Sequence, residues 1–266
     1  MSPNPESGDL ALLGDAAREA GALALSMRAQ GLKIWSKSEG SPVTDADMAT
    51  DDLLKTRLLS ARPDYGWLSE ETADDPARLN KRRLFVVDPI DGTAAFMKGR
   101  PWWTVALAVV EDGQPVAAVV FAPQTDEFAE AALGQGARRN GQRVQASDAD
   151  TLEDASILAD AKLLERPIWP EPWPAMRVEK RNSIAYRMTL VAAGAFDAAI
   201  ALGRKWDWDV CAGTLIATEA GAKVSDHRGR PFEFNRPHPY QASLVCAAPA
   251  LQPLILSRCA PISLPD

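Results

Sequence analysis

One six-residue string constrains the fold more than any other part of the chain. A short apolar run, residues 84–87, is followed at once by DPIDGT, residues 88–93. The run predicts a buried strand, and the proline and glycine predict a fixed, tight turn at its end. The fold must therefore hold two carboxylates, three residues apart, on a rigid turn at the edge of a sheet.

Such a turn has a chemical consequence. Asp88 and Asp91 repel each other unless a cation lies between them, and the carbonyl of Ile90 can face the same cation. Hard divalent ions prefer this mixture of carboxylate, carbonyl and water oxygens. Gly92 and Thr93 begin a predicted helical turn, whose free N–H groups suit phosphate oxygens. The string predicts a metal site beside an anion site, although a plain turn is the alternative interpretation.

Three other acidic segments lie far from this string: VTDAD at 43–47, SEE at 69–71 and WD at 208–209. Each has a simpler explanation when taken alone. Adjacent glutamates are usually solvent-facing, and an acid at a helix start is usually a cap. Each segment is weak evidence alone. Their order and spacing along the chain, together with the DPIDGT string, match a known pattern that is described below.

Composition narrows the class of cation and of partner. The three cysteines are far apart without a CxxC pair, and there are only two histidines, which disfavours a disulfide scaffold or a zinc site. The net charge of −7 disfavours binding of a nucleic-acid polymer. No apolar run reaches about 18 residues, so no membrane span is predicted. The polar start is not typical of a secretory signal, which predicts a cytoplasmic location.

The pattern of predicted elements changes near residue 150. The first half reads as two helices followed by a strand meander, an α+β pattern: 10–28, 44–59, 84–87, 102–110, 115–121 and 127–132. The second half alternates strand and helix, an α/β pattern: 156–159, 184–193, 196–201, 209–220 and 244–247. Within the second half, residues 166–174 carry four prolines and are predicted to be a loop. Asp209 is the expected cap of the last helix.

These patterns predict a division into two subdomains. Residues 1–8 are expected to be a disordered lead-in. Residues 9–150 would form an N-terminal α+β subdomain with most of the metal ligands. Residues 151–266 would form a C-terminal α/β subdomain that supplies Asp209 and substrate contacts.

Together the motifs resemble a known family. DPIDGT followed by Phe96 resembles the first signature of the inositol monophosphatase superfamily of lithium-sensitive, magnesium-dependent phosphatases. WDVCAG at 208–213, followed by TEAGA at 218–222, resembles the second signature. The resemblance runs over most of the chain and implies a layered αβαβα sandwich of the sugar-phosphatase type, with the site at the junction of two subdomains. It also implies lithium sensitivity and is compatible with a homodimer.

The resemblance implies roles for individual residues. Two or three Mg²⁺ ions would activate a water for attack on phosphorus, with these ligands: Glu70, Asp88, the Ile90 carbonyl, Asp91 and Asp209. Asp47 and Thr93 resemble the pair that orients this water, and Glu70 completes the catalytic set. Trp-Asp occurs twice in KWDWD, and Asp209 is preferred to Asp207 because Val-Cys-Ala-Gly follows it.

The substrate prediction rests on sequence likeness and on charge. Segments 91–123 and 182–200 look most like the bacterial 3′(2′),5′-bisphosphate nucleotidase branch. A nucleotide with a second phosphate needs cations away from the metals, although solvated surface cations are the alternative interpretation. Where inositol phosphatases carry a Glu for ring hydroxyls, a gap-free alignment places Leu202. The predicted substrate contacts are Gly92, Thr93, Ser183, Arg187 and Lys205.

The leading prediction is therefore release of the 3′-phosphate from adenosine 3′,5′-bisphosphate, which leaves AMP. The alternatives of the same class are an inositol-1-monophosphatase and a broad-specificity sugar or histidinol phosphatase. The alternative of a different class is a non-catalytic protein that binds a phosphorylated ligand.

Overall fold

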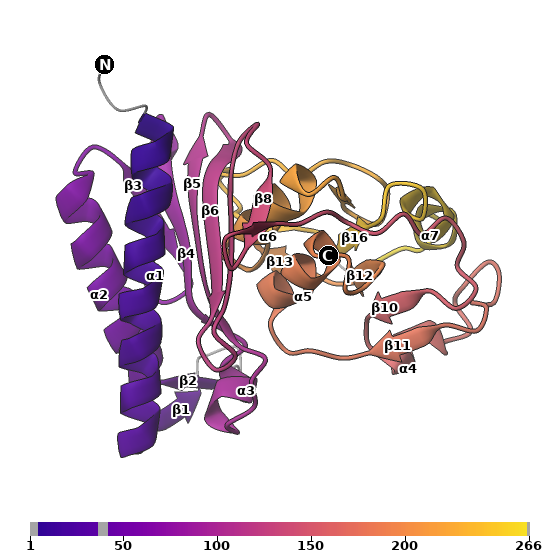
Figure 1. The fold of residues 1–266 in the computed structure, drawn as a ribbon, viewed down its shortest axis with the longest axis horizontal. Coiled ribbons are helices and arrows are strands. Elements are labelled where there is room, and N and C mark those ends of the chain that lie inside the picture. The colour runs from indigo at the N-terminus through magenta and orange to yellow at the C-terminus, as the bar shows by residue number, and fades with distance from the viewer. Residues whose placement is uncertain (1–4, 37–41, 265–266) are drawn as a thin grey trace.

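A seven-stranded sheet organises the first half of the chain in the computed structural model, which describes residues 5–36 and 42–264 (Figure 1). Its strand order is β3-β4-β5-β6-β7-β8-β9, and only the β3–β4 pair is parallel. The bounds are β3 Gly66–Ser69, β4 Arg83–Asp91, β5 Thr104–Glu111, β6 Gln114–Ala122, β7 Glu127–Ala132, β8 Ala137–Arg139 and β9 Gln142–Arg143. The predicted meander is confirmed.

Two hairpin turns in this sheet follow from their sequences. Asp112 and Gly113 have φ values of 48° and 81°, and Asn140 and Gly141 have 48° and 77°. Asp-Gly and Asn-Gly tolerate two successive positive φ angles, which match the twist of the flanking strands. The strands on either side of each turn therefore pair antiparallel, with one register shift between Val109 and Val110 in the β5–β6 pair.

Helices cover both faces of the sheet. Helices α1 (Pro5–Gln30) and α2 (Asp45–Ala61) lie on one face, and α5 (Ile184–Ala192) and α6 (Asp207–Glu219) lie on the other (Figure 1). A Cβ at Gly213 of α6 would lie 2.7 Å from the Met188 sulfur of α5. The glycine of the second signature thus lets α5 and α6 approach closely.

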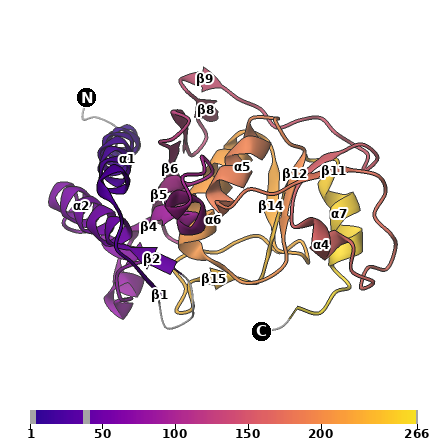
Figure 2. The same ribbon diagram turned by 90° about the horizontal axis from the view of Figure 1, so that it is seen from below.

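A second sheet lies beyond α5 and α6, in the order β11-β10-β12-β16-β14 (Figure 2). Its strands are β10 Ser156–Leu158, β11 Arg177–Glu179, β12 Ala198–Ala201, β14 Lys223–Ser225 and β16 Leu244–Ala247. Helix α7 (Gln252–Cys259) packs against β16. The five layers are therefore helix, sheet, helix, sheet, helix, and the predicted αβαβα sandwich is confirmed.

The remaining elements are short and lie around the layers. They are β1 Ile34–Ser36, β2 Pro42–Thr44, the 3₁₀ helix Pro76–Asn80, α3 Thr93–Met97, α4 Ala161–Leu164, β13 Lys205–Trp206 and β15 Tyr240–Gln241. Across the described ranges, none of the helices combines the length and the apolar character that crossing a membrane requires.

Several element boundaries differ from the sequence expectations. Residues 5–8 of the expected lead-in belong to α1, while residues 1–4 lie outside the described residues. Strand β4 continues through Asp91 instead of ending at residue 87, because a bulge absorbs the turn. Helix α6 begins at Asp207 with Trp206 as its N-cap, so Asp209 is its third residue and not its cap.

The division near residue 150 stays a prediction. The two sheets are formed by residues 66–143 and 156–247, on either side of it. However, one hydrophobic core joins the first sheet to α5 and α6 and to the second sheet, for example through Val86, Met188 and Cys246.

Candidate metal and phosphate site

Three carboxylates from two distant segments of the chain meet at the end of β4. Asp88 and Asp91 come from β4, and Asp209 comes from the first turn of α6. One ligand oxygen from each lies within 4.8 Å of the others. The site therefore forms where the first sheet meets the helix layer that leads to the second sheet.

A β-bulge places Asp88 and Asp91 on the same side of their strand. Asp88 pairs with Ala106 of β5 and Asp91 pairs with Thr104, so β4 contains one extra residue between the two pairs. In a regular strand, residues three apart point to opposite faces. The extra residue corrects this alternation and brings both carboxylates together.

The environment of Asp88 fits a bound cation. Its Oδ1 accepts a hydrogen bond from the Ile90 N–H at 3.0 Å, whereas its Oδ2 is buried without a hydrogen-bond partner among the described residues. Burial, followed by repulsion from Glu70, Asp91 and other acids, raises the pKa of Asp88 well above its ordinary value. A buried carboxylate oxygen without a partner is unfavourable, and a hard cation would satisfy it.

Asp91 is fixed by the start of α5. Its Oδ2 accepts hydrogen bonds from Ser183 Oγ at 2.6 Å and from Ala185 N at 2.7 Å. Burial raises the pKa of Asp91 to about 6, and these hydrogen bonds oppose the rise. Both bonds fall on one oxygen, so they orient the carboxylate toward the other two acids.

The expected assignment of Ser183 as a substrate contact stays a prediction, and the structure gives this residue several partners within the protein. Its side chain is fully buried, it caps α5 by accepting from Tyr186 N at 2.8 Å, and Thr104 Oγ1 lies 3.0 Å away. Its one hydroxyl proton is used on Asp91. In the structure Ser183 therefore positions the carboxylate of Asp91.

Asp209, rather than Asp207, lies with the β4 acids. Asp209 Oδ2 accepts from Trp206 N at 3.0 Å, and burial, then Asp91 and Glu70, raise its pKa to about 8. Asp207 is fully buried elsewhere, and its Oδ1 accepts from Gln241 Nε2 at 2.9 Å. Of the two acids in the repeated Trp-Asp, Asp209 is therefore the one beside Asp88 and Asp91, and its role as the metal ligand stays a prediction.

Glu70 lies beside the three-carboxylate cluster. It follows β3, and its N–H donates to the Val87 carbonyl at 3.3 Å, so it is next to the start of the DPIDGT segment. Its charge raises the pKa values of Asp47, Asp88, Asp91 and Asp209. Glu70 therefore lies close enough to these four aspartates for its negative charge to disfavour their ionised forms.

Asp47 and Thr93 are joined across the site. Thr93 Oγ1 lies 3.1 Å from Asp47 Oδ1 and 3.2 Å from the Ile90 carbonyl. Thr44, the N-cap of α2, donates to Asp47 Oδ2 from its N–H at 2.9 Å and from its Oγ1 at 2.5 Å. The capping box of α2 thus fixes the carboxylate that holds Thr93.

Gly92 adopts a conformation that other residues disfavour. Its φ is 96°, and a Cβ there would lie 3.0 Å from the Trp102 carbonyl and 3.2 Å from the Ser183 N–H nitrogen. Both the backbone angle and the space require glycine at this position.

Arg187 and Lys205 line a pocket of about 320 Å³ beside the acids. Lys162 and Arg166 line it from the α4 side, together with the single acid Asp160. Burial lowers the pKa of Arg187 and of Lys205, and Asp91 and Asp209 respectively oppose this. Lys162 and Arg166 were not predicted from the sequence. Lys162 lies in the four-residue helix α4 and Arg166 begins the proline-rich loop, and neither segment has a periodic hydrophobic pattern.

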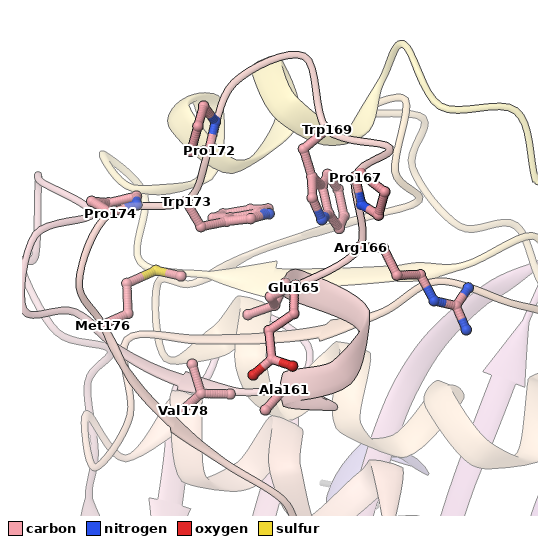
Figure 3. A pocket seen from close by; sticks show the side chains of 11 residues that line it. Ala161, Glu165, Arg166, Pro167, Trp169, Pro172, Trp173, Pro174, Met176 and Val178 are labelled. Atoms are coloured by element: carbon pink, nitrogen blue, oxygen red, sulfur yellow. The ribbon is translucent and has the colours of Figure 1, made fainter.

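A second pocket, of about 480 Å³, lies between α4 and the loop of residues 166–174 (Figure 3). Trp169 and Trp173 form its walls, with ring centroids 5.1 Å apart and nearly perpendicular planes. Glu165 is the only acid among the residues that line it. It lacks the paired carboxylates of the β4 site and does not suit a divalent cation.

Comparison with known proteins agrees with this geometry. A sequence model described as the inositol monophosphatase family matches residues 10–262. An inositol-1-monophosphatase of Rhizobium meliloti is 32% identical, covering 77% of this chain and 80% of the relative. The 3′(2′),5′-bisphosphate nucleotidase CysQ of Escherichia coli K12 is also 32% identical, covering 76% and 83%.

A solved structure supports the same grouping. The extragenic suppressor protein suhB of Bartonella henselae superposes with a TM-score of 0.82 and 26% identity, over 94% of this chain and 97% of that one. With its sequence match over nearly the whole length and its carboxylates gathered at the end of β4, this chain belongs to the inositol monophosphatase family.

Proposed function

We propose that the protein is a 3′(2′),5′-bisphosphate nucleotidase that converts adenosine 3′,5′-bisphosphate to AMP and phosphate. Membership in the family makes the chain a phosphatase. The substrate is the proposal, because relatives with different named activities are equally similar.

The acidic cluster provides the ligands for the cofactor. We assign two or three Mg²⁺ ions to the oxygens of Glu70, Asp88, Ile90, Asp91 and Asp209. When bound, such ions neutralise charge on the phosphate and acidify the attacking water. Asp88 Oδ2 supports this assignment, because it is buried and has no hydrogen-bond partner in the described part of the chain.

Thr93 and Asp47 would orient the attacking water. A threonine hydroxyl has one proton, which Thr93 can donate to Asp47 Oδ1 at 3.1 Å. Its lone pairs then accept a proton of the water and set its direction. Asp47 keeps this orientation because Thr44 fixes its other oxygen.

Gly92 and Thr93 would contact the scissile phosphate. The left-handed Gly92 leads the chain into α3, and the backbone N–H groups of this turn would bind phosphate oxygens. In-line attack then inverts phosphorus, and the leaving 3′-oxygen carries the departing charge.

The single observation that favours a bisphosphate is the pocket of about 320 Å³ beside the acids, called the cationic pocket below. Arg187, Lys205, Lys162 and Arg166 outnumber its one acid, Asp160. Leu202 lines the same pocket, where an inositol phosphatase would need an acceptor for ring hydroxyls. Cations without such an acceptor suit a second phosphate better than a polyol.

Fewer observations support the alternative functions than support the bisphosphate nucleotidase. An inositol-1-monophosphatase or a broad-specificity sugar or histidinol phosphatase agrees with the family but leaves the cationic pocket unused. A non-catalytic binding protein would not need Thr93 held against Asp47. The cytoplasmic location and the homodimer remain proposals.

The test compares substrates on the purified protein with Mg²⁺. We expect a higher kcat/KM for adenosine 3′,5′-bisphosphate than for inositol 1-phosphate or 3′-AMP. Lys205→Gln should lower kcat/KM for the bisphosphate about tenfold, since one charge-assisted contact is lost, and should change that for 3′-AMP much less. The exposed Lys223→Gln serves as the matched control. Preference for inositol 1-phosphate would overturn the substrate assignment.

A further inference from the structure

Asp51 lies one helical turn after Asp47, on the same face of α2. It is 2% exposed, and no part of the mechanism above uses it. Its side chain points toward the end of β3, where the chain turns into Glu70. One helix therefore contacts both segments that carry the site, β3 and the DPIDGT turn.

The two oxygens of Asp51 bind hydroxyls on either side of Glu70. Ser69 Oγ donates to Oδ1 in a short hydrogen bond, and Thr72 Oγ1 donates to Oδ2 at 2.6 Å. Ser69 and Thr72 directly bracket the Glu70-Glu71 pair. The carboxylate thus closes a small ring of contacts around the segment that presents Glu70.

Other bonds fix the direction of both hydroxyls. Ser69 Oγ accepts from the Glu71 N–H at 3.4 Å, and Thr72 Oγ1 accepts from Trp67 Nε1 at 3.2 Å. Each hydroxyl must then use its proton on Asp51, so position 51 must accept twice. A carboxylate does this, whereas an amide offers a single oxygen acceptor.

A buried acid at this position needs an explanation beyond packing. Removing a carboxylate from water is unfavourable unless hydrogen bonds satisfy its oxygens, and here both oxygens are used on the segment around Glu70. Outer groups that orient ligands commonly change metal affinity by about 10–100-fold when removed. The arrangement suits a residue that sets the geometry of a cation site.

We propose that Asp51 is a positioning residue that holds Glu70 in place for metal binding through Ser69 and Thr72. This inference rests on the proposed role of Glu70 as a metal ligand. It predicts that Asp51 affects metal affinity more than the chemical step, because it touches neither the phosphate nor the attacking water.

The experiment measures Mn²⁺ binding to the purified full chain by calorimetry, and kcat at saturating Mg²⁺. Asp51→Ala should weaken Mn²⁺ binding about tenfold and raise the Mg²⁺ concentration for half-maximal rate similarly. Its kcat at saturating Mg²⁺ should stay within about threefold of the original, a difference of under 1 kcal/mol. Asp51→Asn, which keeps one acceptor, should lie in between.

Asp52→Ala is the matched control, because it removes a neighbouring charge from an exposed position. Should Asp51→Ala fail to fold, Thr72→Val removes one of the two contacts and should still weaken Mn²⁺ binding. An unchanged Mn²⁺ affinity in a folded Asp51→Ala, or in Thr72→Val, would overturn the inference alone. Absence of Mn²⁺ binding in the unaltered protein would instead overturn the proposed function.

Discussion

Asp88 and Asp91 lie three residues apart on one strand, yet each offers an oxygen within 4.8 Å of the other. The bulge between their pairings with Ala106 and Thr104 makes this contact. Without a cation, the fold holds two buried acids against each other and against Asp209. This repulsion, built into β4, underlies the predictions that follow.

Replacing Asp88 by asparagine should separate stability from activity. Asp88→Asn removes a ligand and should lower kcat by at least about a hundredfold, since a metal supplies several kcal/mol of charge stabilisation. The same change relieves repulsion, so the metal-free variant should melt at a higher temperature than the metal-free original. Thermal melts with and without chelator, beside phosphate-release assays, check both halves. A rate equal to the original would discard the role of Asp88.

Thr93→Val should impair the chemical step and leave metal binding nearly unchanged. Valine keeps the shape but loses the hydroxyl that bonds Asp47 and that is proposed to orient the attacking water. Loss of such a proton-transfer or orienting group typically costs about 10²–10⁴-fold in rate. Steady-state kinetics and Mn²⁺ calorimetry measure the two effects, with the exposed Thr56→Val as control. A large loss of Mn²⁺ affinity would contradict this division of roles.

Gly92→Ala should be more damaging than glycine replacement at another positive φ. Gly31 has φ 101° with nothing within 4 Å of an added Cβ, so Gly31→Ala measures backbone strain alone, about 1–2 kcal/mol. Gly92→Ala adds the clash with the Trp102 carbonyl at 3.0 Å. Urea unfolding should therefore show a greater loss for Gly92→Ala, together with loss of activity. Equal losses would mean that the close approach at Gly92 does not matter.

The contribution of Glu111 to the free energy of unfolding should depend on pH. Arg83 donates to its Oε2 at 2.7 Å, and this hydrogen bond lowers the pKa of Glu111 below 4.5. A lowered pKa in the folded state adds stability above the unfolded value, and this stability is lost as pH falls through the folded value. Glu111→Gln should thus cost about 1 kcal/mol at pH 7 and less at pH 3. Urea unfolding at both pH values measures this, and an equal cost at both would contradict it.

Much of the site could be predicted from the sequence because its acids lie in short, contiguous motifs. The DPIDGT string gave Asp88, Asp91 and the Gly92 turn, and the repeated Trp-Asp narrowed the third acid to two residues. The bulge was not predicted, since a bulge depends on pairing with β5. The position of Ser183 depends on the packing of α5 against β4, which no local pattern reports.

The cationic pocket and the Asp51 contacts could not be predicted from the sequence, because both depend on how distant segments pack together. Lys162 and Arg166 belong to a four-residue helix and a proline-rich loop, where hydrophobic spacing carries no signal. Asp51 looks like one more acid in an acidic helix until β3 is placed beside it. Side chains that act through other segments become visible only when those segments are docked.

The most direct test is a crystal of the unaltered protein soaked with Mn²⁺ and adenosine 3′,5′-bisphosphate, with data collected at the manganese edge. The account predicts anomalous peaks within about 2.0–2.6 Å of oxygens from Asp88, Asp91 and Asp209, the range for hard cations, with the 3′-phosphate beside them. Anomalous peaks that avoid these three carboxylates, or a phosphate bound elsewhere, would contradict it.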